Sequence, residues 1–206
     1  EQKWLGYSEQ KNLANRLASH DWILSIDADE VISEELKKSI LKIKETDTPD
    51  SFVFSFNRLN NYCGKWIHHS GFYPDKKIRI WNRNIGQWKG IVHEIIDFST
   101  KTREIHLKGD LLHYSYSSPE DFEKQVFRFA EMRAQHYCDK GKKNASLLKI
   151  VSPIFFFIKH YIVRLGFLDG KEGFVMCWVS AKATRHKYKT LERLMNKDKR
   201  LKTKGN

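Results

Sequence analysis

Residues 21–30 read Asp-Trp-Ile-Leu-Ser-Ile-Asp-Ala-Asp-Glu, an apolar run that ends in a cluster of acids. Residues 22–26 predict a short buried strand, because an apolar run without polar alternation is typical of strands covered on both faces. Open α/β sheets bind ligands beyond the carboxyl ends of their strands, which is where these acids stand. The stretch therefore predicts an α/β fold with a ligand site beside Asp27 and Asp29.

The two aspartates are suited to a metal ion. Residues two apart on a strand point to one face of the sheet. Carboxylates on one face bind a hard divalent cation such as Mg²⁺ or Mn²⁺ and leave coordination positions for phosphate oxygens. Such an ion neutralises charge on a departing diphosphate. The alternative is that the strand runs into a turn, where Asp27 and Asp29 are solvated or cap the strand end.

The surrounding sequence alternates helix and strand signals. Ser8 precedes a helical pattern over residues 9–19, and Ser33 is a candidate cap for a helix with Glu34 and Glu35 in its first turn. Ser118 and Pro119 begin a long helical pattern that reaches about Lys140. Further strand candidates are residues 52–56, 77–81, 91–96 and 110–116, with a loop over 58–70.

The character of the chain changes after residues 141–144. Residues 150–168 are strongly apolar, and residues 171–195 are helical and increasingly basic. Strand, helix and strand at the start, followed by helices at the end, predict an α/β core over 1–117 and a helical extension over 118–206.

Charge and cysteine content narrow the function classes. The 206 residues contain 37 Lys and Arg against 25 Asp and Glu, a formal charge of +12 that favours nucleic acid, phosphorylated small molecules or an acidic membrane surface. The three cysteines form no Cys-x-x-Cys pair, so neither a disulfide framework nor a zinc site is expected, and a reducing compartment is favoured. Because no signal peptide and no initiator Met stand at the start, we expect a processed chain or part of a longer protein.

Six ordered segments carry a family likeness. They are Gly6-Tyr7-x-x-Gln10-Lys11-Asn12, residues 21–30, Lys77-Ile78-Arg79-Ile80-Trp81, Gly90-x-x-His93-Glu94, Leu112-His113-Tyr114-Ser115-Tyr116 and Gly166-Phe167-Leu168-Asp169-Gly170. Together they resemble family 2 glycosyltransferases of the lipopolysaccharide-core glucosyltransferase type, to about residue 190. The resemblance implies a GT-A fold, in which a Rossmann-like sheet binds the nucleotide with Asp-x-Asp at a strand end. Family members begin with a strand and a βα unit that hold the base, so we expect this sheet to be incomplete at its N-terminus.

The resemblance also implies an activity: inverting, metal-dependent transfer of a hexose from a nucleotide sugar to a glycan or lipid-linked acceptor in cell-envelope biosynthesis. It assigns Glu94 as the base that takes the acceptor proton, with His93 orienting it or contacting phosphate. Apolar neighbours would partly desolvate Glu94 and raise its pKa. The alternative is a partly exposed glutamate at an element end, with Asp97 as the base.

Three further residues are candidates at the donor. His113 lies on a strand candidate and is either a third metal ligand or a core histidine. Arg79 contacts phosphate or pairs with a surface carboxylate, and Lys11 contacts the diphosphate or belongs to a solvated helix face.

Three tryptophans are candidates for stacking on a sugar: Trp66, Trp81 and Trp88. Aromatic side chains present a large flat apolar surface to such a ligand. Core packing is the alternative for each of them.

The apolar segment near the C-terminus suits a membrane surface. Ser152 and Pro153 are a candidate helix start, followed by an apolar run that Lys159 interrupts well short of the ~20 residues of a membrane span. One arc holds Lys149, Ser152, Lys159, His160 and Arg164, and the opposite arc holds Ile154, Phe157, Ile158, Tyr161 and Leu165. This predicts an interfacial helix on an anionic membrane and a cytoplasmic protein, peripheral on the inner face of the cell membrane. The alternative is a helix packed on the catalytic core.

Three rival functions remain from the sequence. A nucleic-acid-binding module would explain the basic charge, but no helix-turn-helix, RRM or zinc pattern is found, so no nucleic-acid partner is expected. Another nucleotide-sugar or nucleotidyl transferase would use the same metal chemistry. A non-catalytic remnant of a transferase is the third.

Overall fold

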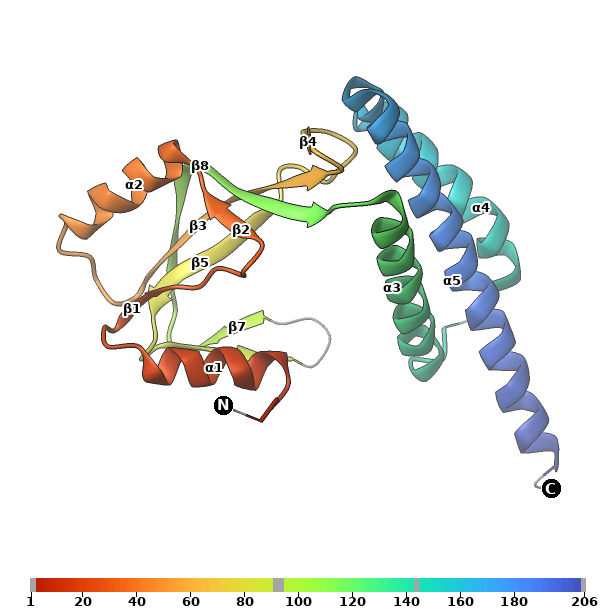
Figure 1. The fold of residues 1–206 in the computed structure, drawn as a ribbon. Helices are drawn as coiled ribbons and strands as arrows, with labels where there is room; N and C mark the ends of the chain where they lie inside the picture. Colours follow the sequence, from red (N-terminus) through yellow and green to blue (C-terminus); the bar gives the residue numbers. More distant parts are fainter. Residues whose placement is uncertain (1–2, 91–94, 143–144, 205–206) are drawn as a thin grey trace. The chain divides into compact units, whose positions relative to one another are not determined.

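The protein divides into two compact units in a computed structural model that describes residues 3–90, 95–142 and 145–204. The first unit comprises Glu1–Arg58 and Asp75–His113, and the second comprises Leu59–Pro74 and Tyr114–Asn206 (Figure 1). The sequence predicted a single boundary at residue 117. The structure instead groups residues 59–74 with the C-terminal helices.

The first unit combines helices with a sheet in which most neighbouring strands pair antiparallel. Its elements are α1 (Tyr7–Leu17), β1 (Trp22–Leu24), β2 (Glu30–Ile32), α2 (Glu34–Lys44), the start of β3 (Phe52–Tyr62), β5 (Lys76–Asn82), β6 (Gly86–Lys89), β7 (Ile95–Phe98) and most of β8 (Arg103–Tyr116). The sheet order is β1-β5-β3-β8-β2, and β6 and β7 form a separate antiparallel pair. The predicted α/β core followed by a helical part is confirmed.

Helix α2 begins where its cap was predicted. The Ser33 hydroxyl accepts a hydrogen bond from the Leu36 backbone N–H at 3.2 Å, and two glutamates occupy the first turn, where the helix dipole favours them. Leu36 is fully buried and packs with Phe54, Phe56 and Leu111 of the sheet. The cap therefore fixes where α2 begins, and with it which α2 residues pack in the core.

Three boundaries differ from the prediction. Ser8 lies inside α1 rather than at its cap, because Gly6 holds that position and the Ser8 hydroxyl donates to the Gly90 carbonyl at 2.5 Å. Strand β1 ends at Leu24, short of the predicted end. Strand β3 runs on to Tyr62, into the predicted loop, because its second half pairs with β4 (Lys65–Ile67).

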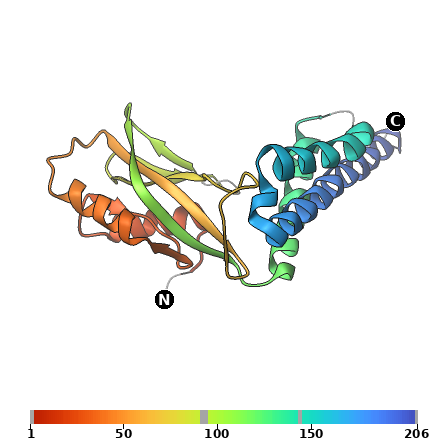
Figure 2. The same ribbon diagram turned by 90° about the horizontal axis from the view of Figure 1, so that it is seen from above.

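The second unit is built around one long helix. It contains β4, α3 (Pro119–Asp139), α4 (Ala145–Phe157), the π-helix η1 (Ile158–Val163), the short 3₁₀-helix η2 (Gly166–Asp169) and α5 (Gly170–Lys204). Helix α5 packs against both α3 and α4 (Figure 2). The predicted start of α3 at Ser118 and Pro119 is confirmed. The predicted helix start at Ser152 is wrong, since α4 begins at Ala145 and Pro153 lies inside it.

Asp169 ties the loop after β4 to the start of α5. Its carboxylate is 3% exposed and accepts hydrogen bonds from the backbone N–H groups of His68 at 3.1 Å and His69 at 2.9 Å. The His69 ring lies 3.0 Å from the same carboxylate. A buried carboxylate needs such partners, which gives a structural role to the motif at residues 166–170.

Gly109 provides a test of the packing between β8 and α2. Its φ is +93°, and a Cβ there would collide with the backbone of Leu36. We expect Gly109→Ala to lower the free energy of unfolding by ~3 kcal/mol or more. The added methyl group would meet backbone atoms of α2, which cannot move aside as the end of a flexible side chain can. Denaturant unfolding followed by circular dichroism measures this.

Gly6→Ala is the matched control. Gly6 has a φ of +96°, and nothing lies within 4 Å of an added Cβ. The substitution therefore adds backbone strain of ~1–2 kcal/mol but no collision. Equal losses in the two variants would contradict the packing described at Gly109.

Candidate functional site

The two aspartates predicted as metal ligands lie in a turn between β1 and β2, and they face different partners. Lys11 lies 3.1 Å from one carboxylate oxygen of Asp27, and Arg79 lies 3.2 Å from the other. Asp29 instead pairs with His113, whose Nε2 lies 3.2 Å away. The prediction that they share one face of a strand is wrong, because β1 ends at Leu24 and the chain has already turned.

Glu30 anchors this turn from the inside. Its side chain is fully buried, and one carboxylate oxygen accepts a hydrogen bond from Arg79 at 2.6 Å. The other oxygen accepts the backbone N–H of Asp27 at 2.8 Å. Arg58 lies 3.6 Å from the same carboxylate. The charges of Glu30 and Arg79 therefore hold the backbone of the turn in place.

The charges around the turn set the protonation of Asp27 and His113. Burial would raise the pKa of Asp27, but Arg79 and Lys11 together outweigh it, so the pKa lies below its usual value. Burial lowers the pKa of His113, and Arg58 lowers it further, against the opposing effect of Asp29. At neutral pH this leaves Asp27 ionised and favours the neutral imidazole of His113, the form that binds metal ions.

A cleft of about 630 Å³ opens beside Asp27. Its charged lining residues are Lys11, Arg58, Lys76, Lys77 and Arg79 against Asp27 and Glu104. Cations therefore outnumber acids in the lining, and low-dielectric walls strengthen their field. The cleft is suited to a ligand that carries several negative charges.

Asp29 and His113 are the residues that fit a metal ion here. Within residues 3–90, 95–142 and 145–197, no three His, Cys, Asp or Glu side chains gather closely enough to enclose one. Asp29 and His113 nevertheless lie 3.2 Å apart, and the Asp29 side chain is 54% exposed. Phosphate-bound Mg²⁺ typically uses only one or two protein carboxylates, with the other ligands coming from phosphate and water. The pair therefore fits a metal carried with a nucleotide.

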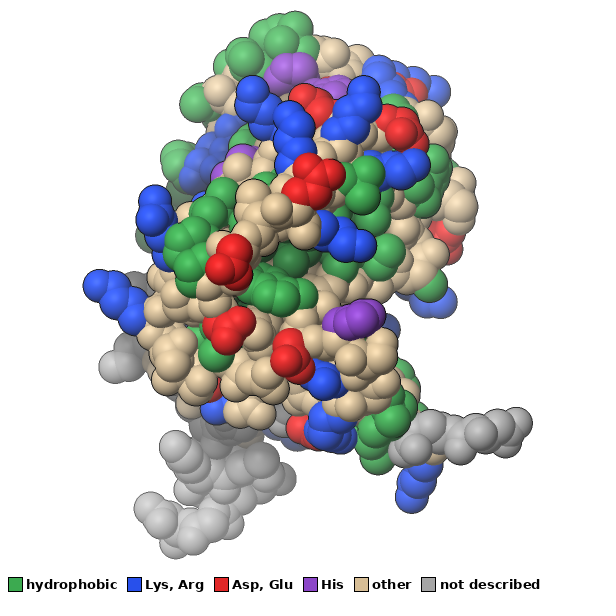
Figure 3. Space-filling model, turned by 90° about the vertical axis from the view of Figure 1, so that its left-hand side faces the viewer, with side chains coloured by type: hydrophobic (Ala, Val, Ile, Leu, Met, Phe, Trp, Pro, Cys, Tyr) green, Lys and Arg blue, Asp and Glu red, His purple; other side chains and the backbone are tan. Residues whose placement is uncertain are grey.

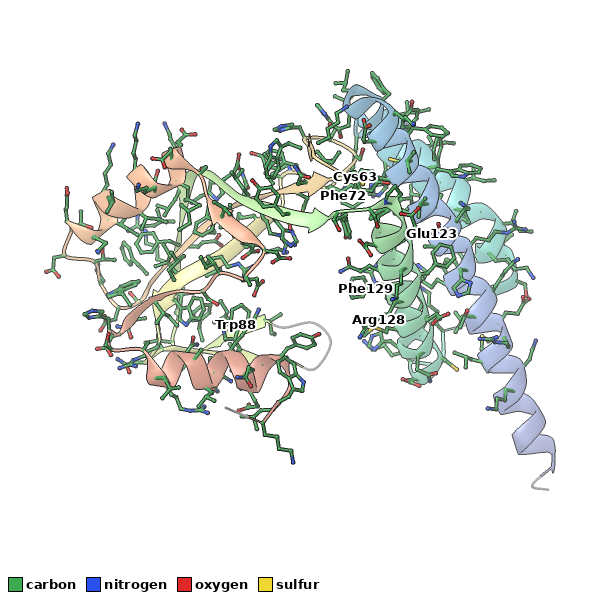
Figure 4. The ribbon with its side chains drawn as sticks, viewed as in Figure 1. Cys63, Phe72, Trp88, Glu123, Arg128 and Phe129 are labelled. Carbon is green, nitrogen blue, oxygen red and sulfur yellow. The ribbon has the colours of Figure 1, made fainter. Side chains whose placement is uncertain are left out.

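Trp88 belongs to the core of the first unit. It is 7% exposed and meets Trp81 edge to face at 5.5 Å. Figure 4 places it on the side of α1 that faces the sheet, and the Lys11 ammonium covers its ring at 4.7 Å. Trp88 also lines the cleft beside Asp27, so its packing favours the core alternative while sugar stacking stays a prediction.

Trp66 lies in the second unit, beside another aromatic ring and at the wall of a cavity. It meets Tyr114, which is 54% exposed, at 5.2 Å. Both rings line a cavity of about 420 Å³ with Asn61 and Tyr116. Amide and aromatic groups together are a common lining for sugar sites, so sugar stacking by Trp66 stays a prediction.

His93 and Glu94 lie outside the described residues. The strands on either side of them pair antiparallel, with Lys89 opposite Ile95. Ile95 lines the cleft that holds Asp27. Asp97, the rival base, pairs with Lys89 at 2.6 Å.

Sequence reasoning missed Glu30 and Arg58. An acid that follows Asp-x-Asp gives no sign of being buried, and Arg58 fell in a predicted loop. The signal for Glu30 was the short strand that it begins, in which it and Ile32 lie on the same side. Arg58 gave no comparable signal, because its bond to Asp75 joins two residues far apart in the chain.

The comparison with known families decides the class of the protein. Residues 1–106 match the family model described as Glycosyl transferase family 2. The chain belongs to glycosyl transferase family 2.

The chain is also similar to curated proteins of Rickettsia. An uncharacterized glycosyltransferase of Rickettsia typhi is 28% identical over 181 residues, which cover 84% of this chain and 62% of the relative. One of Rickettsia prowazekii has the same identity and coverage. The chain thus spans less than two thirds of these family 2 relatives, and its two units are consistent with a GT-A-like fold and a helical C-terminal part.

The buried pair at the turn provides a stability test. We expect Glu30→Ala to lower the free energy of unfolding by ~3–5 kcal/mol, because Arg79 keeps its charge in the interior without its closest partner. Denaturant unfolding measures the loss. Glu34→Ala is the control: Glu34 has 82% of its side chain exposed and lies 3.9 Å from Lys37, so its loss stays below ~1 kcal/mol. A Glu30→Ala protein as stable as the control would contradict the anchoring role.

Proposed function

We propose that the protein transfers a hexose from a nucleotide-sugar donor to a glycan or lipid-linked acceptor, with inversion at the anomeric carbon. The observation that carries the proposal is the cationic cleft around Asp27, inside a region that matches glycosyl transferase family 2. A cell-envelope glycan of the lipopolysaccharide type is the proposed product, on the resemblance of the six ordered segments.

The first unit would bind the donor diphosphate. Lys11 and Arg79 already meet the carboxylate of Asp27, so both are placed to exchange part of that contact for phosphate oxygens. Asp29 and His113 would hold a divalent cation, with Asp27 close by in the same turn. The ion would supply charge neutralisation on the departing diphosphate.

Glu94 would act as the base. The acceptor hydroxyl oxygen forms a bond to the anomeric carbon while the bond from that carbon to the diphosphate oxygen breaks, and the hydroxyl proton goes to the Glu94 carboxylate. His93 would orient Glu94 or contact phosphate. The Trp66 cavity is the proposed stacking surface for a sugar ring.

The rival functions are less well supported. A nucleic-acid-binding module needs a patch or stripe of positive charge. On the one face that Figure 3 shows, acidic and basic side chains are interspersed. A nucleotidyl transferase with the same cleft would bind the same diphosphate, and only the transferred group separates it from the proposal.

Metal-dependent nucleotide binding tests the donor site. Calorimetry on the full-length protein should show nucleoside diphosphate binding that requires Mn²⁺ or Mg²⁺ and that Asp29→Ala weakens at least tenfold, since a metal ligand is lost. Glu34→Ala, in the exposed first turn of α2, is the control. Unchanged affinity in Asp29→Ala would remove Asp29 from the site.

The base assignment has its own test. Glu94→Gln keeps the shape of the side chain but cannot accept the proton, so turnover of the donor and acceptor pair should fall by ~10²-fold or more while donor binding persists. Asp97→Asn is the matched variant and should retain turnover. The reverse outcome, an active Glu94→Gln and an inactive Asp97→Asn, would transfer the role to Asp97.

A further inference from the structure

The second unit exposes an unusual amount of apolar surface. More than half of the large apolar side chains that are exposed in the described residues lie between residues 147 and 178. We call the following set the apolar face: Leu147, Ile150, Val151, Ile154, Phe155, Ile158, Ile162, Phe167, Leu168 and Trp178. Contiguous exposed apolar surface of this kind marks an interaction site.

Seven members of the apolar face lie on α4 and η1, and Phe167, Leu168 and Trp178 come from η2 and α5. Along α4 and η1 its members recur at intervals of three or four residues, which places them in line. Residues 145–163 form 19 helical residues of mean hydropathy 1.5, and apart from Ala145, which is 4% exposed, none of them is buried. By length and composition alone the stretch is able to cross a membrane. The predicted helix through Lys159 is confirmed, and Lys159 interrupts its apolar run but not the helix.

Other residues of the same helix, both polar and apolar, pack on the protein, and Leu148 joins a core cluster with Tyr188 and Leu191 of α5. Lys149 pairs with Glu192 of α5 at 2.7 Å. The Nδ1 atom of His160 lies 2.6 Å from the Ser70 carbonyl oxygen, and the Ser70 N–H donates to the Arg164 carbonyl at 3.0 Å. Lys149 and His160 of the predicted polar arc therefore have partners within the protein.

The exposed stripe of this helix departs from the usual arrangement. A helix on a soluble domain buries its apolar side and presents its polar side to water. Here Phe157 and Tyr161 do pack on Phe174 of α5, but the neighbouring stripe through Ile154 and Ile158 remains open. A second surface is needed to cover that stripe.

We propose that the apolar face docks on a lipid bilayer and lies in the interface without crossing it. The helix is bound to α5 along its other side, and crossing would separate Lys149 from Glu192 and leave charges in hydrocarbon. A helix that is apolar on one side and polar on the other is typical of interfacial binding.

The chemistry of the face favours lipid over protein as the occupant. No Asp or Glu occurs between residues 145 and 168, so no carboxylate there repels anionic headgroups. Trp178 is an exposed aromatic of the kind enriched at membrane interfaces, and exposed Phe155 and Phe167 are typical of the apolar side of an interfacial helix. Lys159 is exposed beside the stripe and has the length to reach headgroups. A protein partner is usually met by a polar rim that carries both signs of charge.

Vesicle co-sedimentation of the full-length protein tests the proposal. Wild type should bind vesicles of phosphatidylethanolamine and phosphatidylglycerol, and binding should persist in ~0.5 M NaCl, because apolar insertion is not screened by salt. Ile154→Gln with Ile158→Gln should reduce the partition coefficient at least tenfold. Both side chains are exposed, at 60% and 46%, so the fold should not depend on them.

A matched pair on the first unit serves as the control. Val31→Gln with Leu41→Gln removes two apolar side chains of similar exposure, 50% and 49%, and should leave vesicle binding unchanged. As a second readout, brominated lipids should quench the fluorescence of Trp178, measured as the difference between wild type and Trp178→Phe.

Three outcomes would overturn the proposal. One is a wild type that ignores vesicles, and another is a Gln pair that binds as tightly as wild type. The third is a self-associated protein in sedimentation velocity that the Gln pair dissociates, which would assign the face to a second copy. None of these measurements uses glycosyl transfer, so their failure is separate from failure of the proposed reaction.

Discussion

A buried ion pair between Glu30 and Arg79 supports the turn on which the donor site is built. Removing both charges from water is costly, and the cost is offset only when further hydrogen bonds satisfy each group. Glu30 meets that condition by accepting the Asp27 backbone N–H in addition to Arg79. The turn after β1 is therefore held by these charges together with the backbone hydrogen bond from the Glu30 N–H to the Asp27 carbonyl at 3.0 Å.

The same pair determines what Asp27 and Asp29 are able to do. Arg79 forms ion pairs with both Glu30 and Asp27, and Lys11 forms a second ion pair with Asp27. The Asp27 carboxylate is therefore paired with two basic side chains. Asp29 stands outside this group, beside a histidine whose pKa is held below its ordinary value. The two aspartates thus have different roles in the proposed site: one organises the cations, and the other is open to a metal.

Local signals carried much of the fold, and they failed where distant contacts decide the outcome. Ser33 and Ser118 act as the helix caps that the sequence predicted, because a cap depends on three or four neighbouring residues. The extension of β3 to Tyr62 depends on β4, which the sequence could not place. The residues of α4 that meet α5 could not be predicted either, because helical periodicity shows that two sides differ without showing which residues are packed.

The central claim is that a nucleoside diphosphate and a metal ion meet at the turn between β1 and β2. The most direct measurement is anomalous scattering from Mn²⁺ in crystals of the full-length protein grown with a nucleoside diphosphate. The account predicts a Mn²⁺ peak about 2.1 Å from a carboxylate oxygen of Asp29, with the diphosphate in contact with Lys11 and Arg79. A diphosphate bound away from these two cations, or a metal bound without Asp29, would contradict it.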